Sequence, residues 1–403
     1  MQEMKKNVSV LEKSKCYSCR SCFLSCPKGA ITMEESAEGF FYPSVDEARC
    51  TGCGLCARRC PALSPHSAGG FTGKTYAARL KDRERLLQSA SGGVFAGLAE
   101  AVLAEGGVVF GAAYDDGMSV RHIAVESASG LQRLKGSKYV ESFTGDSFRE
   151  AEAFLKSGRT VLYSGTPCQI AGLRAFLGKD YDNLLTVDLI CHGVPSRKLF
   201  AKYLEWLGRK CGGRIIYYGF RDKDVGGWSC GGKFKTKTKT KTKTKTMDAL
   251  CDPYYASFLR CETYRESCYT CPFAGMERAG DITVGDFWGI EQFHPDFDRD
   301  GGVSAVIVST EKGGRLLEGL RGKFDLLECA ADEMRAHNTN LRHPSERPAM
   351  RDSIYQGIDS DRLCAYFRKF RCKNRAVFLT RRLLVSLMPG GMKEFLKKMR
   401  RLG

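Results

Sequence analysis

The sequence has no apolar run long enough to cross a bilayer, which takes about 20 residues in a helix. Even residues 377–388 are interrupted by Arg381 and Arg382. Residues 1–15 are polar and lack the apolar core of a secretory signal. These absences predict a cytoplasmic protein, because cytoplasmic thiols stay reduced and can serve as metal ligands.

The sequence also lacks an excess of positive charge in its central part, despite a formal net charge of +17. Lysines that alternate with threonine over residues 235–245 supply +6, and residues 367–403 supply +11, which together account for all of it. The rest of the chain is neutral, which argues against a nucleic-acid partner. The Lys-Thr repeat has the period of a strand or hairpin edge, and we interpret it as a solvated protrusion without chemistry.

The cationic end of the chain combines twelve lysines and arginines with apolar residues over 367–403. Pro389-Gly390-Gly391 divides it into two expected amphipathic helices. Such helices suit contact with a partner or peripheral binding to an anionic membrane surface. A solvated helical tail is an equal alternative on charge grounds. We therefore expect a basic amphipathic C-terminal extension over residues 331–403.

Cysteine is abundant, with 19 in the chain, and eight of them form a doubled C-x2-C-x2-C-x3-C-P run between residues 16 and 60. In two-cluster ferredoxins the fourth cysteine of each run binds the cluster of the other run. Crossed ligation predicts two 4Fe-4S clusters, one held by Cys16, Cys19, Cys22 and Cys60 and the other by Cys50, Cys53, Cys56 and Cys26. A zinc site and a disulfide framework fit less well, since zinc favours widely separated C-x2-C pairs and disulfides need an oxidising compartment.

The apolar segments 29–31 and 40–45 are expected to be the strands of this ferredoxin unit, residues 1–65, which a Pro-, Ser- and Gly-rich linker follows. Beyond the linker, helices and strands alternate. The expected helices are 94–105, 147–156, 167–177, 196–207 and 311–321, and the expected strands are 108–114, 160–163, 184–190, 281–286 and 304–309, with a more antiparallel region from 214. This order predicts an α+β ferredoxin-like domain followed, over residues 75–330, by an α/β domain with a mixed, largely parallel sheet.

One segment, Ser164-Gly165-Thr166-Pro167-Cys168-Gln169, lies where a strand passes into a helix. Thr166 suits the N-cap and Pro167 the first helical position. Cys168 then falls in the first turn, where the helix dipole favours a thiolate. It could be a nucleophile, a redox thiol, a cluster ligand or a small buried residue, and the segment alone leaves these alternatives open.

Further cysteines could join Cys168 in a third metal site. Cys191 ends the next strand, and Cys268 and Cys271 form a C-x2-C pair with Cys261 seven residues upstream. The ends of parallel strands line ligand crevices in α/β sheets. Four thiolates for a third cluster are thus available, and a zinc site on Cys261, Cys268 and Cys271 is an equally good alternative.

Glycine clusters offer an anion site. Ser91-Gly92-Gly93 opens a helix whose free N–H groups can hold a phosphate, and Lys135-Gly136-Ser137-Lys138 adds two cations. Each could equally be a simple cap or turn. No G-x-G-x-x-G follows the first strand, so an ordinary Rossmann dinucleotide site is not indicated.

Several of these motifs occur together in one family. Ser91 to Phe95, Gly136 to Val140, Ser164 to Gln169, Ile190 to Gly193, Cys268 to Cys271 and Asp281 to Gly289 follow one another in the order typical of it. Over about residues 75–330 the chain resembles the coenzyme F420 hydrogenase/dehydrogenase beta subunit family, preceded by a two-cluster ferredoxin domain.

The resemblance implies FAD and a third 4Fe-4S cluster bound by Cys168, Cys191, Cys268 and Cys271. It implies that Ser91, Gly92, Gly93, Lys135, Ser137, Lys138, Gly165 and Thr166 lie about the flavin and its phosphates, with Asp286 near the same crevice. The expected function is that of an oxidoreductase passing electrons between a hydride donor or acceptor, with coenzyme F420 one candidate, and the ferredoxin clusters. Its partner would be a redox protein or a small-molecule hydride donor, and no residue is assigned as catalytic. The alternative is a non-catalytic electron-transfer subunit whose flavin site is empty.

Overall fold

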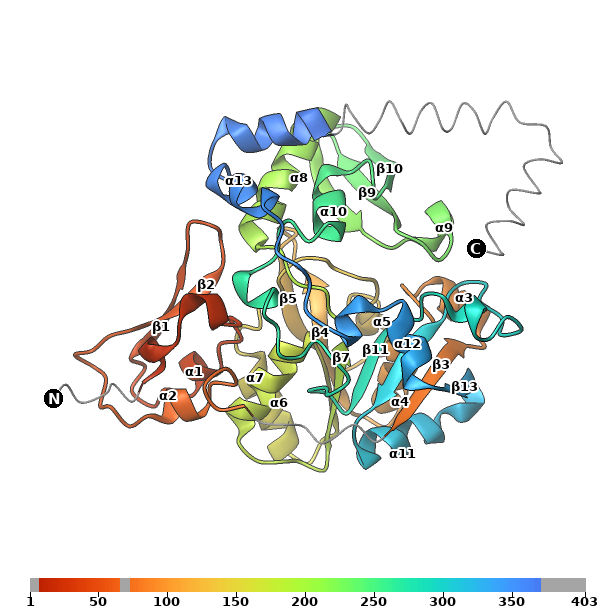
Figure 1. Cartoon of the computed structure of the whole chain (residues 1–403), viewed down its shortest axis with the longest axis horizontal. Coiled ribbons are helices and arrows are strands. Elements are labelled where there is room, and N and C mark those ends of the chain that lie inside the picture. The colour runs from red at the N-terminus through yellow and green to blue at the C-terminus, as the bar shows by residue number, and fades with distance from the viewer. Residues whose placement is uncertain (1–6, 66–72, 371–403) are drawn as a thin grey trace.

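The computed structural model describes residues 7–65 and 73–370 (Figure 1). At its N-terminal end lies a small unit with a two-stranded antiparallel sheet, β1 (Ile31–Glu35) and β2 (Phe41–Val45), in which Ile31 faces Val45. Two short helices, α1 (Ser21–Leu24) and α2 (Leu55–Arg58), carry the third cysteine of each run. The 3-10 helices Val8–Val10 and Lys13–Lys15 precede them.

The central sheet has eight strands in the order β13-β3-β12-β11-β7-β6-β4-β5. These strands are β3 (Lys74–Leu80), β4 (Val108–Tyr114), β5 (Val120–Val125), β6 (Val161–Ser164), β7 (Leu184–Leu189), β11 (Ile282–Asp286), β12 (Ser304–Val308) and β13 (Phe324–Cys329). The predicted α/β character is confirmed, but the expectation of a largely parallel sheet is wrong, because only the β11-β7-β6-β4 centre is parallel and both flanks are antiparallel. A short turn joins β4 to β5, and so short a connection permits only antiparallel pairing.

Helices cover both faces of this sheet. They are α3 (Arg83–Leu87), α4 (Val94–Ala104), α5 (Ala128–Leu131), α6 (Ser147–Lys156), α7 (Pro167–Leu177), α11 (Glu311–Gly319) and α12 (Ala331–Ala336). Along β4, Val109 packs toward the cluster that contains α4, whereas Val108 and Phe110 pack toward the cluster that contains α6 and α7. The apolar residues of a strand buried on both faces thus build two cores.

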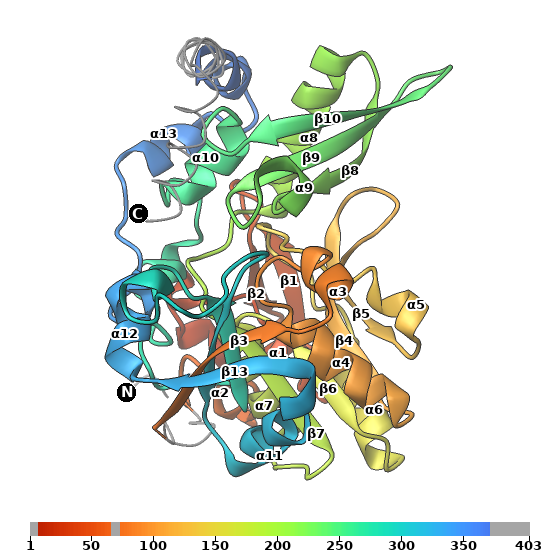
Figure 2. The same ribbon diagram turned by 90° about the vertical axis from the view of Figure 1, so that its right-hand side faces the viewer.

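A second, three-stranded antiparallel sheet lies apart from the first, with the order β10-β9-β8. Its elements are β8 (Arg214–Gly219), β9 (Gly231–Lys237) and β10 (Thr242–Asp248), with α8 (Arg197–Cys211), α9 (Lys223–Gly226) and α10 (Pro253–Leu259) around it. The Lys-Thr repeat forms the β9-β10 hairpin, which projects from the molecule (Figure 2). Phe234 and Thr236 point inward while Lys235 and Lys237 stay exposed, so the predicted hairpin edge is confirmed.

Residues 331–370, which the sequence analysis assigned to the C-terminal extension, pack on the body of the protein. They include α13 (Met350–Gln356) and a helix that begins at 361. Tyr355 and Phe367 belong to the same aromatic core as Phe200 of α8. The cationic remainder, residues 371–403, lies outside the described residues, so its predicted helices stay a prediction.

Short 3-10 helices complete the described chain: Glu266–Cys268, Ile290–Gln292, Arg321–Lys323 and Thr339–Leu341. No helix within residues 7–65 and 73–370 has the length and hydropathy needed to cross a membrane.

Candidate functional site

The eight N-terminal cysteines surround two separate cavities. Cys16, Cys19, Cys22 and Cys60 line one of them, and Cys26, Cys50, Cys53 and Cys56 line the other. This is the grouping that crossed ligation requires. The first four cysteines are buried, whereas Cys53 is exposed. The second cavity is therefore the one whose thiols reach the surface of the unit.

The two cysteine runs share a backbone conformation that explains this grouping. Ser18 and Gly52 occupy equivalent places in the first gap, and Arg20 and Gly54 in the second, and all four have φ between 57° and 72°. Left-handed residues other than glycine are uncommon and gather at functional sites. At these positions the chain reverses between successive cysteines, which turns three thiols of each run toward one point.

The remaining predicted ligands come from three elements. Cys168 lies in the first turn of α7, Cys191 follows β7, and Cys268 and Cys271 lie at and just after the 3-10 helix Glu266–Cys268. Burial and the neighbouring thiols raise the pKa of Cys268 to about 11 and that of Cys271 to about 12. Cys191 has its pKa raised by burial and by Cys268, Cys168 and Cys271. The four thiols are thus close enough to repel one another as thiolates, a cost that metal binding would offset.

Cys261, the third member of the alternative zinc trio, shares its tyrosine neighbours with Cys268. Its carbonyl accepts a hydrogen bond from the Tyr269 hydroxyl at 2.6 Å, and its thiol interacts with Tyr264. Among the described residues, no three His, Cys, Asp or Glu side chains are arranged to hold a single metal ion. The same is true of the cysteine sets predicted to hold clusters, so the zinc trio and the third cluster stay alternative predictions.

The start of α7 has the predicted capping but not the predicted acidity of its thiol. Thr166 is the N-cap and Pro167 follows it, and the Gln169 side chain accepts a hydrogen bond from the Thr166 N–H at 3.0 Å. The helix dipole was expected to favour the Cys168 thiolate. Burial instead raises the pKa of Cys168, outweighing Arg265, Thr166 and the local N–H groups that lower it.

A cavity of about 300 Å³ lies between the starts of α4 and α7 and the ends of β7 and β11. Eight of the nine residues predicted to bind the flavin line it: Ser91, Gly93, Lys135, Ser137, Lys138, Gly165, Thr166 and Asp286. Gly92 lies beneath the wall, where a Cβ atom would be 2.1 Å from the Ala78 carbonyl oxygen. Cys191 also lines this cavity, so it adjoins the third set of cysteines.

The groups predicted to bind phosphate differ in whether they already have hydrogen-bond partners within the protein. Gly93 has φ of 81° and leads into α4 without a side-chain cap, and Val94, Phe95 and Ala96 of the first turn line the cavity. The Lys138 ammonium donates to the carbonyls of Leu134, Lys135 and Gly136 at 3.1–3.3 Å. Burial lowers the pKa of Lys138 to about 7. The helix start can hold an anion, whereas Lys138 shapes the loop around it.

Asp286 is held at another wall of the cavity by partners that no sequence motif predicted. It pairs with Arg221 at 2.7 Å and accepts a hydrogen bond from the Trp228 indole at 2.6 Å. Trp228 in turn stacks on Trp288 with ring centroids 4.9 Å apart. Asp286 therefore neutralises a buried cation and ties Arg221 and Trp228 to this wall. Trp288 belongs to the Asp281–Gly289 motif, which was the only part of this wall that the sequence indicated.

His122 also lines the cavity and was missed, because it lies in an unpredicted strand. Its Nε2–H donates to the Ser164 carbonyl at 2.9 Å, and its Nδ1 accepts from the Ser142 hydroxyl at 2.8 Å. The ring stacks on Tyr163 with centroids 5.3 Å apart. Burial lowers the pKa of His122 to about 4 from the usual 6.5. The neutral ring of His122 therefore links β5 to the end of β6 at Ser164 and to Ser142 in the cavity wall.

We expect this histidine to make folding sensitive to acid. Between pH 6.5 and pH 4, His122 is protonated in the unfolded chain but neutral in the folded chain. The free energy of unfolding therefore falls as the pH falls through this window. The loss approaches about 3 kcal/mol at the acid end, from the pKa difference. His122→Gln should flatten this dependence in urea unfolding followed by circular dichroism under anaerobic conditions. Parallel pH profiles for the wild type and the variant would contradict the assignment.

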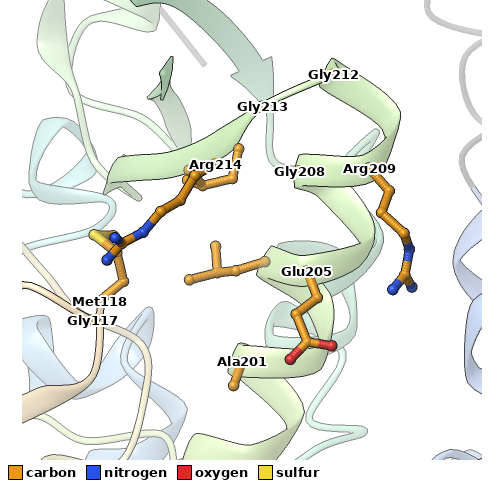
Figure 3. Close-up of a pocket in the computed structure, with 11 residues that line it drawn as sticks. Gly117, Met118, Ala201, Glu205, Gly208, Arg209, Gly212, Gly213 and Arg214 are labelled. Atoms are coloured by element: carbon orange, nitrogen blue, oxygen red, sulfur yellow. The ribbon is translucent and has the colours of Figure 1, made fainter. Parts of the chain in front are cut away.

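A larger cavity, of about 660 Å³, opens between α8, the start of β8 and the loop of Gly117 and Met118 (Figure 3). Glu205, Arg209 and Arg214 are its charged residues. None of the predicted ligands or cofactor residues lines it. Its size therefore does not make it the candidate site.

Two family models match parts of this chain. Residues 15–63 match the family model of the 4Fe-4S dicluster domain, and residues 158–332 match that of the C terminus of the coenzyme F420 hydrogenase/dehydrogenase beta subunit. Together with the cysteine-lined cavities, these matches define an iron-sulfur protein. The central part of the chain is similar to the coenzyme F420 hydrogenase/dehydrogenase beta subunit family, as the motifs predicted, and it follows an N-terminal segment that matches the 4Fe-4S dicluster domain.

Two curated relatives illustrate the two parts. The coenzyme F420-dependent sulfite reductase of Methanocaldococcus jannaschii is 27% identical over 220 residues, 54% of this chain and 33% of the relative. Pyruvate synthase subunit PorD of Methanothermobacter marburgensis is 41% identical over 51 residues, 13% of this chain and 53% of the relative. The chain thus spans between a third and about half the length of these relatives.

Among solved structures, a chain of the F420-reducing [NiFe] hydrogenase complex from Methanosarcina barkeri is similar to this protein. The likeness covers 68% of this chain and 90% of that one, with 19% identity and a TM-score of 0.44. A likeness this weak supports no argument about the site.

Proposed function

We propose that this protein is an FAD and iron-sulfur oxidoreductase, which passes electrons between a hydride donor or acceptor and ferredoxin-type clusters. The observation that supports it most is the shared wall between two sites. Cys191 lines the cavity that eight predicted flavin residues surround, and its thiol belongs to the third set of cysteines. A flavin in this cavity would lie beside a one-electron outlet.

The residues of the cavity fit a flavin by their chemistry. The N–H groups at the start of α4 would hold a phosphate, and the apolar floor contributed by Val94, Val187 and Val284 would receive a ring system. Bound there, a flavin would supply the exchange of a hydride pair for single electrons. Lys138 keeps the loop over the cavity in shape, and Asp286 with Arg221 keeps the opposite wall in place.

The cysteine sets suggest an order for the electron route. The side chain of Tyr17 interacts with Cys168 and Cys271 of the third set and with Cys19 and Cys60 of the first ferredoxin cavity. Helix α7, which begins beside Cys168, touches Cys19 at Gly172, where a Cβ atom would be 2.7 Å from the Cys19 Cβ. The third set and the first cavity are therefore neighbours, and the second cavity, with exposed Cys53, is the outer end.

An external redox protein would meet the chain at this outer end. Relatives of the ferredoxin part include pyruvate synthase subunit PorD and a component of an ion-translocating oxidoreductase complex from Methanosarcina acetivorans, both members of larger assemblies by name. Coenzyme F420 is the favoured hydride carrier, because it appears in the names of the family and of the sulfite reductase. NADH and NADPH are the competitors that an experiment has to include.

The proposal predicts the cofactor content of protein purified without oxygen. We expect about twelve irons and one FAD per chain, since three 4Fe-4S clusters hold twelve irons. Reduced coenzyme F420, NADH, NADPH and dithionite would then be added in parallel, and bleaching of the visible spectrum by one hydride donor would identify it. About eight irons without flavin would instead support the alternative, a non-catalytic electron-transfer subunit.

A further inference from the structure

We propose that Arg265, together with its ion-pair partner Glu141, sets the reduction potentials of the third cysteine set and the first ferredoxin cavity relative to that of the outer cavity, which Cys53 lines. The proposal rests on the proposed function, because it requires that both cysteine sets hold iron-sulfur clusters. It assigns to a buried pair of charged side chains the control of the driving force for electron transfer between these two sites and the outer cluster.

Arg265 occupies the boundary between the two cysteine sets. It is only 2% exposed. Its guanidinium donates to the carbonyl of Tyr17, which stands between Cys16 and Cys19, and pairs with the Glu141 carboxylate. The positive charge is within electrostatic reach of Cys16 on the ferredoxin side and of Cys168 and Cys268 on the other.

The backbone around Arg265 fixes this position. Its N–H donates to the Val194 carbonyl at 3.1 Å, three residues after Cys191, and its carbonyl accepts from the Cys268 N–H at 2.9 Å. The Ser267 hydroxyl donates to the Cys16 carbonyl at 3.0 Å. The segments that carry Cys191, Cys268 and Cys16 are thus tied together at this arginine, so the guanidinium cannot move far from either set.

A buried ion pair is costly to desolvate and is weak support for stability. Here the pair is also incompletely satisfied, since Arg265 Nε and Glu141 Oε2 are buried without a hydrogen-bond partner in the described part of the chain. Such unpaired buried groups call for an explanation other than stability. Charges fixed beside two redox sites supply one, because the charge and hydrogen bonds around a cluster set its potential.

The sign of the effect follows from simple electrostatics. When one electron leaves one site and arrives at its neighbour, no bond is made or broken and no proton has to move. The site that receives it becomes more negative by one charge, which a nearby cation stabilises and a nearby anion destabilises. Arg265 therefore raises the potentials of the sites that its charge reaches, and Glu141 lowers them.

The test is a redox titration of the full-length holoprotein with dithionite, followed by electron paramagnetic resonance. Arg265→Gln should lower the midpoint potentials of the third and first sites, and Glu141→Gln should raise them. We expect each to change the reduction equilibrium about tenfold, which corresponds to about 59 mV for a one-electron couple. The cluster at Cys53 should keep its potential in both variants.

Two further variants separate charge from packing. Arg265→Lys keeps the positive charge and should restore potentials close to those of the wild type. Arg351→Gln is the matched control, because Arg351 is a buried arginine whose ion pair with Glu38 also joins the ferredoxin unit to the rest of the chain. It should leave the potentials almost unchanged.

Shifts of the same sign in Arg265→Gln and Glu141→Gln, or no shift in iron-replete variants, would overturn the proposal. So would an equal shift in Arg351→Gln, since it would show a general loosening of the interface. A wild-type protein with only eight irons would defeat the proposed function. The effect of the Arg265 charge could then still be measured as the midpoint potential of the first ferredoxin site, because Arg265 interacts electrostatically with Cys16.

Discussion

Replacing Cys168 with alanine is expected to lower the iron content from about twelve to about eight per chain and to abolish electron transfer to an external one-electron acceptor. The reason is geometric. Cys168 shares its surroundings with Cys191, Cys268 and Cys271, whose thiols interact with one another. Both ferredoxin clusters should survive, since their eight thiols line other cavities. Iron and flavin analysis of the purified variant measures the outcome, and flavin should largely remain.

The matched control is Cys261→Ala. Cys261 lies seven residues before Cys268, but it is not among the thiols that raise the pKa of Cys191, Cys268 or Cys271. It should retain all the iron. An unchanged iron content in Cys168→Ala would mean that this cysteine is only a small buried residue, whose loss costs a modest amount of stability. Loss of metal in Cys261→Ala would revive the zinc trio.

The sequence predicted the central helices and strands well because their signals are local. Helix α6 has the predicted bounds, α7 likewise, and β4 spans the predicted residues. Each is a periodic segment bounded by glycine, proline or capping residues, and burial on the sheet does not compete with these preferences. Such elements can be identified without knowledge of their partners.

The flanks of the sheet could not be predicted in this way. β3 pairs with β12 and β13, which come more than two hundred residues later in the chain. Its sequence, Lys-Thr-Tyr-Ala-Ala-Arg-Leu, has no strict alternation, and the buried Arg79 depends on ion pairs with Asp298 and Asp325 from distant parts of the chain. Register and direction here depend on the tertiary partners of the strand, and no local pattern contains them.

The residues of the candidate site also fall into two groups, those in local motifs and those brought together only by the fold. Ser91 and Gly93 could be assigned to an anion site because their motif marks a helix start, whereas Gly165 and Thr166 were assigned to the flavin through the family resemblance. Arg265 and Glu141 are 124 residues apart in the sequence, and neither lies in a recognisable pattern. Arg265 comes shortly before the Cys268 pair, which is the only signal that could have drawn attention to it.

Cys60→Ala is the second substitution with a large expected effect, and it tests crossed ligation. Cys60 belongs to the second run but lines the cavity of Cys16, Cys19 and Cys22. We expect the variant to lose the inner ferredoxin cluster, about four irons, and to keep the outer one. Cys26→Ala is the reciprocal control and should lose the outer cluster, because Cys26 lines the cavity of Cys50, Cys53 and Cys56.

The order of the electron route makes the two variants distinguishable. In Cys60→Ala the step between the third set and the outer cluster is missing, so a hydride donor should no longer reduce the outer cluster, whereas dithionite should reduce it directly at exposed Cys53. In Cys26→Ala the hydride donor should still reduce both remaining clusters, because Tyr17 connects their cavities. Electron paramagnetic resonance after the addition of each reductant would show which clusters are reduced. If Cys60→Ala keeps donor-dependent reduction and Cys26→Ala loses it, the ligation is not crossed, and each run must hold its own cluster.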